Sequence, residues 1–463
     1  MTLPRIVWNA AASPHLETFW VAREQQPLSP TLEKLANTLV QIGIPRVEAA
    51  ATPKEDAIGL LMLAAEVEHA LMVQYLYAAQ SVRGVAGRII SHIAVQEMGH
   101  LVTTQNLLLC LEGISPEGLP ARIHLGRDVL RRGSTYNPLP FVLEGVSPTA
   151  LAKFIVIERP ATIADNMLRA RVEALEAEVT ALGVDPNPVY ALYAAIRWIF
   201  QASDVDPAGL PQRLGFKPGW HLSDADFVDP EQIASFWAEG SEWGSVPGLI
   251  VAPVRDRTGA LAAIDAITAQ GEGAANSEES HFQGFLGVLD SFEAGQIVAA
   301  SLPRTPFTRS QLEPEDDEAV PIVNPYTVLW ADLSSIVYEL LVLDLAWALS
   351  QSRTAAVRAA MIDVCIEGMN RVVQPMAAQL ARRPLDADPQ VKAGPPYGLR
   401  RQESPTTRSK FAARYNTVLA ERDGIIGVIR TASEYSSDIT GKVILESIAA
   451  IDLQRAPNLP QGE

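Results

Sequence analysis

The stretch AVQEMGHLVTTQNLLL, residues 94–109, is rich in apolar residues and has a carboxylate and an imidazole three residues apart, Glu97 and His100. On a helix this spacing places both side chains on one face, with about 5–6 Å between their Cβ atoms. Burying such groups is costly unless they are paired, hydrogen-bonded or bound to a metal ion. The stretch therefore predicts a buried helix whose polar pair is either a structural hydrogen bond or part of a metal site.

The composition limits the classes of function. The chain has 463 residues, of which 48% are hydrophobic and 20% charged, as is typical of a folded globular protein. A formal charge of −17 disfavours binding to nucleic acid or to an anionic membrane surface. The two cysteines form no disulfide framework, the first residues do not resemble a signal peptide, and the longest apolar run is interrupted by Glu339 and Asp344. We therefore expect a soluble, cytoplasmic protein with no nucleic-acid or membrane partner.

Helical periodicity dominates the chain, and convincing period-2 strands are scarce. The pattern predicts helices over 30–42, 53–83, 87–113, 148–182, 189–200, 259–270, 278–300, 325–351, 354–383 and beyond about 406. We expect a mainly α fold with three parts. Residues 1–53 form an N-terminal extension, residues 54–300 a four-helix bundle with a loop insertion at 202–258, and residues 301–463 a C-terminal helical region packed on the bundle.

The Glu-x-x-His pattern occurs three times among only seven histidines, as Glu66/His69, Glu97/His100 and Glu278/His281. Carboxylate-bridged di-iron and di-manganese bundles take one Glu from each of two helices and a Glu-x-x-His pair from each of the other two. Oxygen and nitrogen ligands without sulfur suit iron or manganese. The candidate ligands, in chain order, are Glu68, Glu97, His100, Glu158, Glu272 and His281.

Two of these positions have alternatives. Glu68 shares a helical stripe with Leu61 and Leu71, which directs it into the bundle, whereas Glu66 could pair with His69 beside the ligands. In the fourth helix, Glu278 has the exact three-residue spacing to His281. Glu272 lies between two glycines, where the backbone bends freely, so it can also reach the same ion.

Several blocks together resemble one known family: AEVEHALMVQYLYAAQSV, IAVQEMGHLVTTQNLLLCLEG, FIVIERP, ALYAAI and AIDAITAQGEG…SHFQGF. In order and spacing these are similar to the ferritin-like family of iminophenyl-pyruvate dimer synthases, over roughly residues 55–290. Those enzymes act on amino-acid-derived imines in bisindole pigment pathways such as violacein biosynthesis. The resemblance implies a ferritin-like bundle with a non-heme di-metal centre, and it favours Glu272 over Glu278.

The leading hypothesis is a dioxygen-using non-heme di-iron oxidase or oxygenase that acts on a small amino-acid-derived amine or imine. Its cofactors are two iron ions, with manganese as the alternative, and dioxygen is a co-substrate. The expected partners are the small-molecule substrate, an electron-donor protein and a second copy of the chain. One alternative is a ferritin-like metal-binding or iron-storage protein without an organic substrate, although the long insertions argue against a storage shell. Another is a metal-free structural protein, which is disfavoured because every ligand position holds Glu or His.

Overall fold

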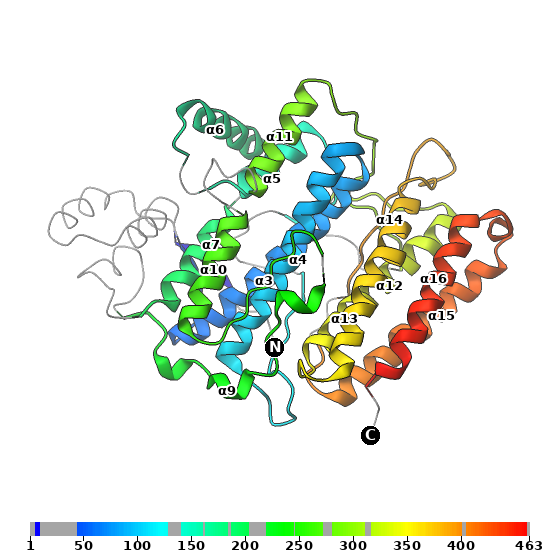
Figure 1. Cartoon of the computed structure of the whole chain (residues 1–463). Coiled ribbons are helices and arrows are strands. Elements are labelled where there is room, and N and C mark those ends of the chain that lie inside the picture. Colours follow the sequence, from blue (N-terminus) through cyan, green and yellow to red (C-terminus); the bar gives the residue numbers. More distant parts are fainter. Residues whose placement is uncertain are drawn as a thin grey trace.

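The computed structural model describes residues 5–9, 44–127, 140–160, 163–183, 187–202, 219–244, 246–271, 280–310, 316–400 and 404–460. These residues form a mainly helical molecule, which confirms the predicted fold class. Figure 1 shows two groups of helices side by side, one from the first two thirds of the chain and one, yellow to red, from the last third. The predicted helix over 30–42 lies outside the described residues. The expected boundaries of the three parts stay a prediction.

The centre of the first group is the antiparallel pair α3, Pro53–Gln80, and α4, Gly84–Glu112, which pack along their whole lengths. The side chain of Thr52 caps α3 by accepting a hydrogen bond from the backbone of Glu55 at 3.2 Å, and Pro53 occupies the first turn, where a missing N–H costs nothing. Nearly every residue of α3 is buried, so this helix is surrounded by protein on all sides. The helices predicted over 53–83 and 87–113 are confirmed.

The third and fourth sides of the bundle are each built from two shorter helices. These are α5, Pro148–Ile157, and α7, Val189–Phe200, on one side, and α10, Arg257–Gly271, and α11, His281–Glu293, on the other. α5 packs on α11 at one end of the bundle, and α7 packs on α10 at the other, as Figure 1 shows. The interruptions therefore lie near the middle of α3 and α4.

One predicted helix, over 148–182, is wrong. The chain leaves helical geometry at Glu158, and a second helix, α6, Asn166–Ala181, follows after a turn. Pro160 explains the break, because proline lacks the N–H that would continue the helix and disfavours helical geometry in the residue before it. As a result Glu158 stands at the end of α5 rather than on a helix face.

A short two-stranded sheet that the periodicity did not predict lies at the edge of the bundle. Strand β1, Ile6–Asn9, pairs antiparallel with β2, Ile44–Val47, and Ile6 lies opposite Val47. The buried carboxylate of Asp56 accepts hydrogen bonds from the backbone of Val47 at 2.8 Å and from the Trp220 indole at 2.9 Å. This carboxylate therefore links the two-stranded sheet and the predicted insertion to the first turn of α3. Within that insertion the described helical turns are η3, Asp224–Asp226, α9, Pro230–Ile233, and η4, Gly240–Trp243.

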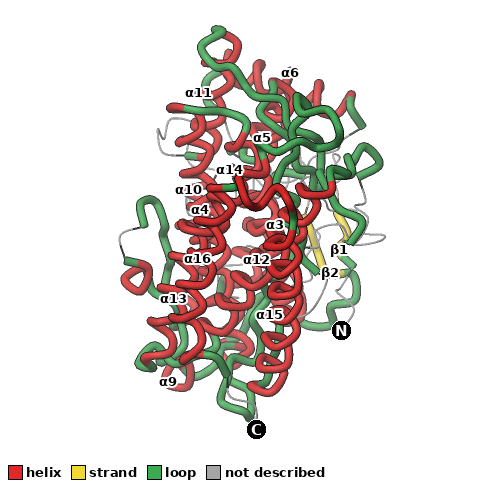
Figure 2. Tube along the Cα trace, turned by 90° about the vertical axis from the view of Figure 1, so that its right-hand side faces the viewer, coloured by secondary structure: helices red, strands yellow, loops and turns green. Residues whose placement is uncertain are grey.

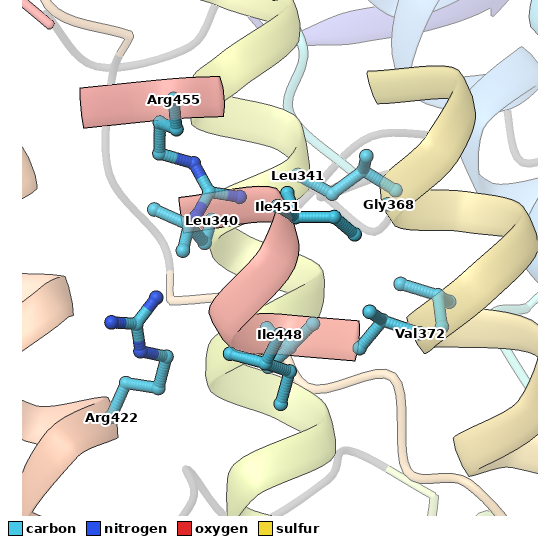
Figure 3. A pocket seen from close by; sticks show the side chains of 10 residues that line it. Leu340, Leu341, Gly368, Val372, Arg422, Ile448, Ile451 and Arg455 are labelled. Atoms are coloured by element: carbon cyan, nitrogen blue, oxygen red, sulfur yellow. The ribbon is translucent and has the colours of Figure 1, made fainter. Parts of the chain in front are cut away.

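The second group of helices surrounds α12, Pro325–Leu349. Its other members are α13, Ala356–Gly368, a π-helical turn η5, Met369–Val373, α14, Gln374–Leu380, α15, Arg408–Thr431, η6, Ser433–Ser437, α16, Ile439–Arg455, and η7, Ala456–Asn458. The buried Asp344 carboxylate of α12 pairs with Arg455 of α16 at 2.8 Å and accepts a hydrogen bond from Tyr415 of α15 at 3.0 Å. A narrow cavity beside this pair has apolar walls from α12, η5 and α16, such as Leu340, Val372 and Ile448 (Figure 3). None of the described helices combines the length and the apolar character that a membrane span needs.

Candidate metal centre

Five of the six predicted ligands lie together where the bundle helices are interrupted. Glu68 is in the middle of α3, Glu97 and His100 are in α4, Glu158 ends α5, and His281 begins α11. Each of these residues is at most 3% exposed. Glu272 and its alternative Glu278 lie outside the described residues. The break after α5 and the start of α11 thus bring single residues from the chain's shorter helices to the polar face of α3 and α4.

Glu97 stands between the two imidazoles. Its Oε2 lies 2.9 Å from Nδ1 of His100, and its Oε1 lies 3.1 Å from Nδ1 of His281. The Glu68 carboxylate faces the same nitrogen of His100, with Oε2 at 3.3 Å from Nδ1. The Glu158 carboxylate likewise faces the same nitrogen of His281, with Oε2 at 3.5 Å from Nδ1. The cluster is therefore nearly symmetric, with one carboxylate shared and one further carboxylate for each imidazole.

The donor set permits metal binding. Suitable ligand atoms of Glu97, His100 and His281 lie within 4.8 Å of one another. Both ring nitrogens of His281 are buried. Nδ1 contacts the Glu97 and Glu158 carboxylates but lacks hydrogen-bond geometry to them, and Nε2 has no hydrogen-bond partner in the described part of the chain. Buried polar atoms without a proper hydrogen bond are rare in folded proteins and indicate an ion or another group at the site. Imidazole and carboxylate ligands without thiolate suit iron and manganese.

The electrostatics of the cluster favour a cation between its side chains. Burial raises the pKa of Glu68, and the carboxylate of Glu97 adds to this effect, so that the pKa reaches about 7. Burial lowers the pKa of His281, but the Glu97 and Glu158 carboxylates overcome this and raise it to about 9. The pKa of His100 is also well above its usual value because Glu68 and Glu97 outweigh its burial. The carboxylates thus stabilise a positive charge at both imidazoles. A divalent cation bound there would supply the same charge.

Two tyrosines hold the outer carboxylates. The hydroxyl of Tyr193, from α7, donates to Oε1 of Glu68, and the hydroxyl of Tyr75, from α3, donates to Oε1 of Glu158 at 2.5 Å. These bonds leave Oε2 of each carboxylate directed at an imidazole. Neither tyrosine is distinctive in the sequence, because both lie in apolar helices where a tyrosine of the core looks the same.

The structure brings Glu68, and not Glu66, into the cluster. The Glu66 carboxylate points away and lies 2.8 Å from Nε2 of His124. His69 does not pair with Glu66, since its Nδ1 faces the Leu125 carbonyl at 3.0 Å and its Nε2 lies 2.5 Å from the Tyr338 hydroxyl of α12. His69 therefore connects the bundle to the second group of helices, and it has no part in the cluster.

A small cavity opens beside the carboxylates, between α7 and α10. Besides four of the clustered residues, its lining consists of apolar side chains and two hydroxyls: Leu71, Val189, Ile267, Gly271, Tyr193 and Thr268. The free volume is about 10 Å³, which is room for about one water molecule. The cluster is thus buried and borders only a narrow space.

Comparisons with known proteins found two similarities. A solved ferritin-like protein from Caulobacter vibrioides is 16% identical over 69% of this chain and 94% of its own length, with a TM-score of 0.38. No curated protein sequence matches the chain. Residues 61–290, which include all six predicted ligands, match the ferritin-like family model. We conclude that this part of the chain is a ferritin-like domain.

Proposed function

We propose that this protein is a non-heme di-iron oxidase or oxygenase that uses dioxygen to oxidise a small amino-acid-derived amine or imine, similar to the iminophenyl-pyruvate dimer synthases. The observation that supports the proposal is the buried cluster of three carboxylates and two imidazoles, in which Glu97 is shared between His100 and His281. A purely structural helix bundle has no need of such a group, because burying these side chains is costly.

The side chains divide into two sets of ligands. Glu68 and His100 would hold one ion, Glu158 and His281 would hold the other, and Glu97 would contribute one oxygen to each. The predicted ligand Glu272, or Glu278 in its place, would add a further carboxylate. When bound, the two iron ions would supply electrons to dioxygen, which is the oxidant that accepts electrons from the substrate. Manganese is the alternative metal, and a return to the reduced form would require an electron-donor protein.

The residues around the proposed ligands would support this reaction. Tyr193 and Tyr75 hold the outer carboxylates in place, as groups around metal ligands commonly do. Burial of every clustered side chain keeps bulk water out. The narrow space beside the centre has apolar walls at Leu71, Val189 and Ile267, and these side chains would have to move apart to admit the substrate.

The test compares two buried glutamates that are two residues apart on α3. Glu68→Gln changes a proposed ligand, while Glu66→Gln changes a carboxylate that faces His124 instead. We expect wild type loaded anaerobically with Fe(II) to consume dioxygen rapidly, and faster still with a panel of amines and imines of aromatic amino acids. Glu66→Gln should retain at least half of this rate, and Glu68→Gln should lose at least about tenfold.

Two results would contradict the proposal. Equal rates in the two variants would show that Glu68 holds no reactive metal. Iron binding without substrate-dependent dioxygen consumption, together with assembly into a very large oligomer, would favour the iron-storage alternative.

A further inference from the structure

A strap, residues 246–252 of the predicted insertion, lies across α4 beside the metal centre. Asn106 of α4 donates to the Ala252 carbonyl at 2.7 Å, and Thr103 Oγ1 accepts from the Ala252 backbone at 3.1 Å. The strap approaches α4 so closely at Gly99 that a Cβ atom there would lie 2.4 Å from the Ile250 carbonyl oxygen. These contacts fix the backbone of the strap next to His100.

Gln270, in the last turn of α10, connects the strap to His100. Its Nε2 donates to the Gly248 carbonyl at 3.3 Å, and its Oε1 lies 3.1 Å from Nε2 of His100. The orientation of this amide is determined by its partners. Because a carbonyl oxygen only accepts hydrogen bonds, Gly248 requires the NH₂ group, and the amide oxygen must then face His100.

This orientation determines which nitrogen of His100 carries a hydrogen. Since Oε1 of Gln270 only accepts, Nε2 of His100 must donate to it. Nδ1 is then free to lose its hydrogen and present a lone pair, and it is Nδ1 that faces the Glu68 and Glu97 carboxylates. A ligating histidine is commonly fixed in this way by a partner on its second nitrogen.

We propose that Gln270 is a positioning residue, which fixes the tautomer of His100 so that Nδ1 binds metal, and that Gly248 of the strap in turn fixes Gln270. The proposal rests on the proposed function only in that the cluster binds metal. It gives the insertion a role at the centre, because a loop far from His100 in sequence sets the orientation of that ligand.

The experiment uses the protein loaded with Zn(II) and labelled with ¹⁵N-histidine, which needs neither dioxygen nor substrate. Gln270→Leu removes the acceptor, and Gln270→Glu restores one. Thr268→Val is the control, because Thr268 lines the same cavity from α10 but its hydroxyl bonds to its own helix, at the Ile264 carbonyl. The readouts are the Zn(II) affinity, by competition with a chelator, and the exchange rate of the histidine ring N–H hydrogens, by NMR.

Wild type and Thr268→Val should show a slowly exchanging Nε2–H assigned to His100, bound through Nδ1. In Gln270→Leu this signal should exchange rapidly and the affinity should fall roughly 10- to 100-fold. Gln270→Glu keeps the acceptor but loses the donor to the Gly248 carbonyl, so its exchange should be slower and its affinity higher than in Gln270→Leu. Unchanged affinity and exchange in Gln270→Leu would overturn this inference while leaving the metal centre intact. Failure of wild type to bind Zn(II) would overturn the metal centre itself and the inference with it.

Discussion

At the scale of single residues, the position of Glu97 determines the character of the centre. Its two oxygens face different imidazoles, whereas Glu68 and Glu158 each face only one. A carboxylate shared in this way neutralises charge on both sides of the cluster. The outer carboxylates serve one side each, so the residues are not equivalent even though all three are buried glutamates.

We therefore predict different metal contents for substitutions in this cluster. Glu97→Gln should leave less than half of one ion per chain, because both sites lose a ligand, while Glu158→Gln should retain about one. Metal content after anaerobic Fe(II) loading and desalting measures this directly. A loss in Glu97→Gln no greater than that in Glu158→Gln would mean that Glu97 is not shared.

The candidate ligands show how far a sequence predicts a site. The spacing of Glu97 and His100 in an apolar helix predicted a buried pair, and the stripe through Leu61 and Leu71 favoured Glu68 over Glu66, as the structure places them. The metal-ligand roles stay predictions, and so does the choice between Glu272 and Glu278. Partners such as Gln270 were not predicted, because a single amide on a helix gives no sign of what a distant loop places against it.

At the scale of elements, the close approach of the strap to α4 depends on Gly99. A methyl group at this position would overlap the Ile250 carbonyl, so Gly99→Ala should displace the strap and destabilise the protein by roughly 1–3 kcal/mol. Gly287→Ala in α11 is the matched control, because no atom lies within 4 Å of its added Cβ. There alanine should be neutral or stabilising by up to about 1 kcal/mol, as it is a better helix former than glycine. Urea unfolding of both variants tests this, and equal effects would contradict the close packing.

Asp438 connects three elements of the second group of helices and gives a prediction about pH. It caps α16 by accepting from the Gly441 backbone at 2.9 Å, and it also accepts from Tyr326 at 2.8 Å and from Arg383. Burial opposes its charge, but these hydrogen bonds prevail and hold its pKa below the usual value. The folded state thus binds the proton less tightly than the unfolded state, and the carboxylate stabilises the fold above about pH 4.

Asp438→Asn should accordingly lower the free energy of unfolding by roughly 1–3 kcal/mol at pH 7. The difference from wild type should shrink as the pH falls below about 4, through the lowered pKa, because wild type then becomes protonated as well. Urea midpoints measured at pH 7, 5 and 3 provide the test. A difference at pH 3 as large as at pH 7 would show that the charge of Asp438 contributes nothing.

At the scale of the whole molecule, long periodic helices were predictable and interruptions were not. α3, α4 and α12 follow from extended apolar patterns, and α3 and α12 also have Thr-Pro and Asn-Pro at their starts. The break at Glu158 was missed, although Pro160 is a sign of it, because the apolar pattern continues beyond the proline. The two-stranded sheet of β1 and β2 pairs residues far apart in sequence, and a local hydrophobic pattern cannot predict such a pairing.

The helix ends at these interruptions also bring the side chains of the cluster together. Because α5 stops just before Glu158 and α11 begins at His281, these two residues meet the middle of α3 and α4 from the same end of the bundle. The ligand set therefore depends on the assembly of the whole ferritin-like domain, and no shorter segment contains it. The central claim is that this assembled cluster binds two metal ions.

The most direct test is the iron content of wild type after anaerobic Fe(II) loading and gel filtration, measured by mass spectrometry. The account predicts about two iron ions per chain, which a strong chelator removes and fresh Fe(II) restores. Iron no higher than in a His100→Ala/His281→Ala variant that folds normally would contradict it, and the cluster would then be a set of buried polar side chains without a metal.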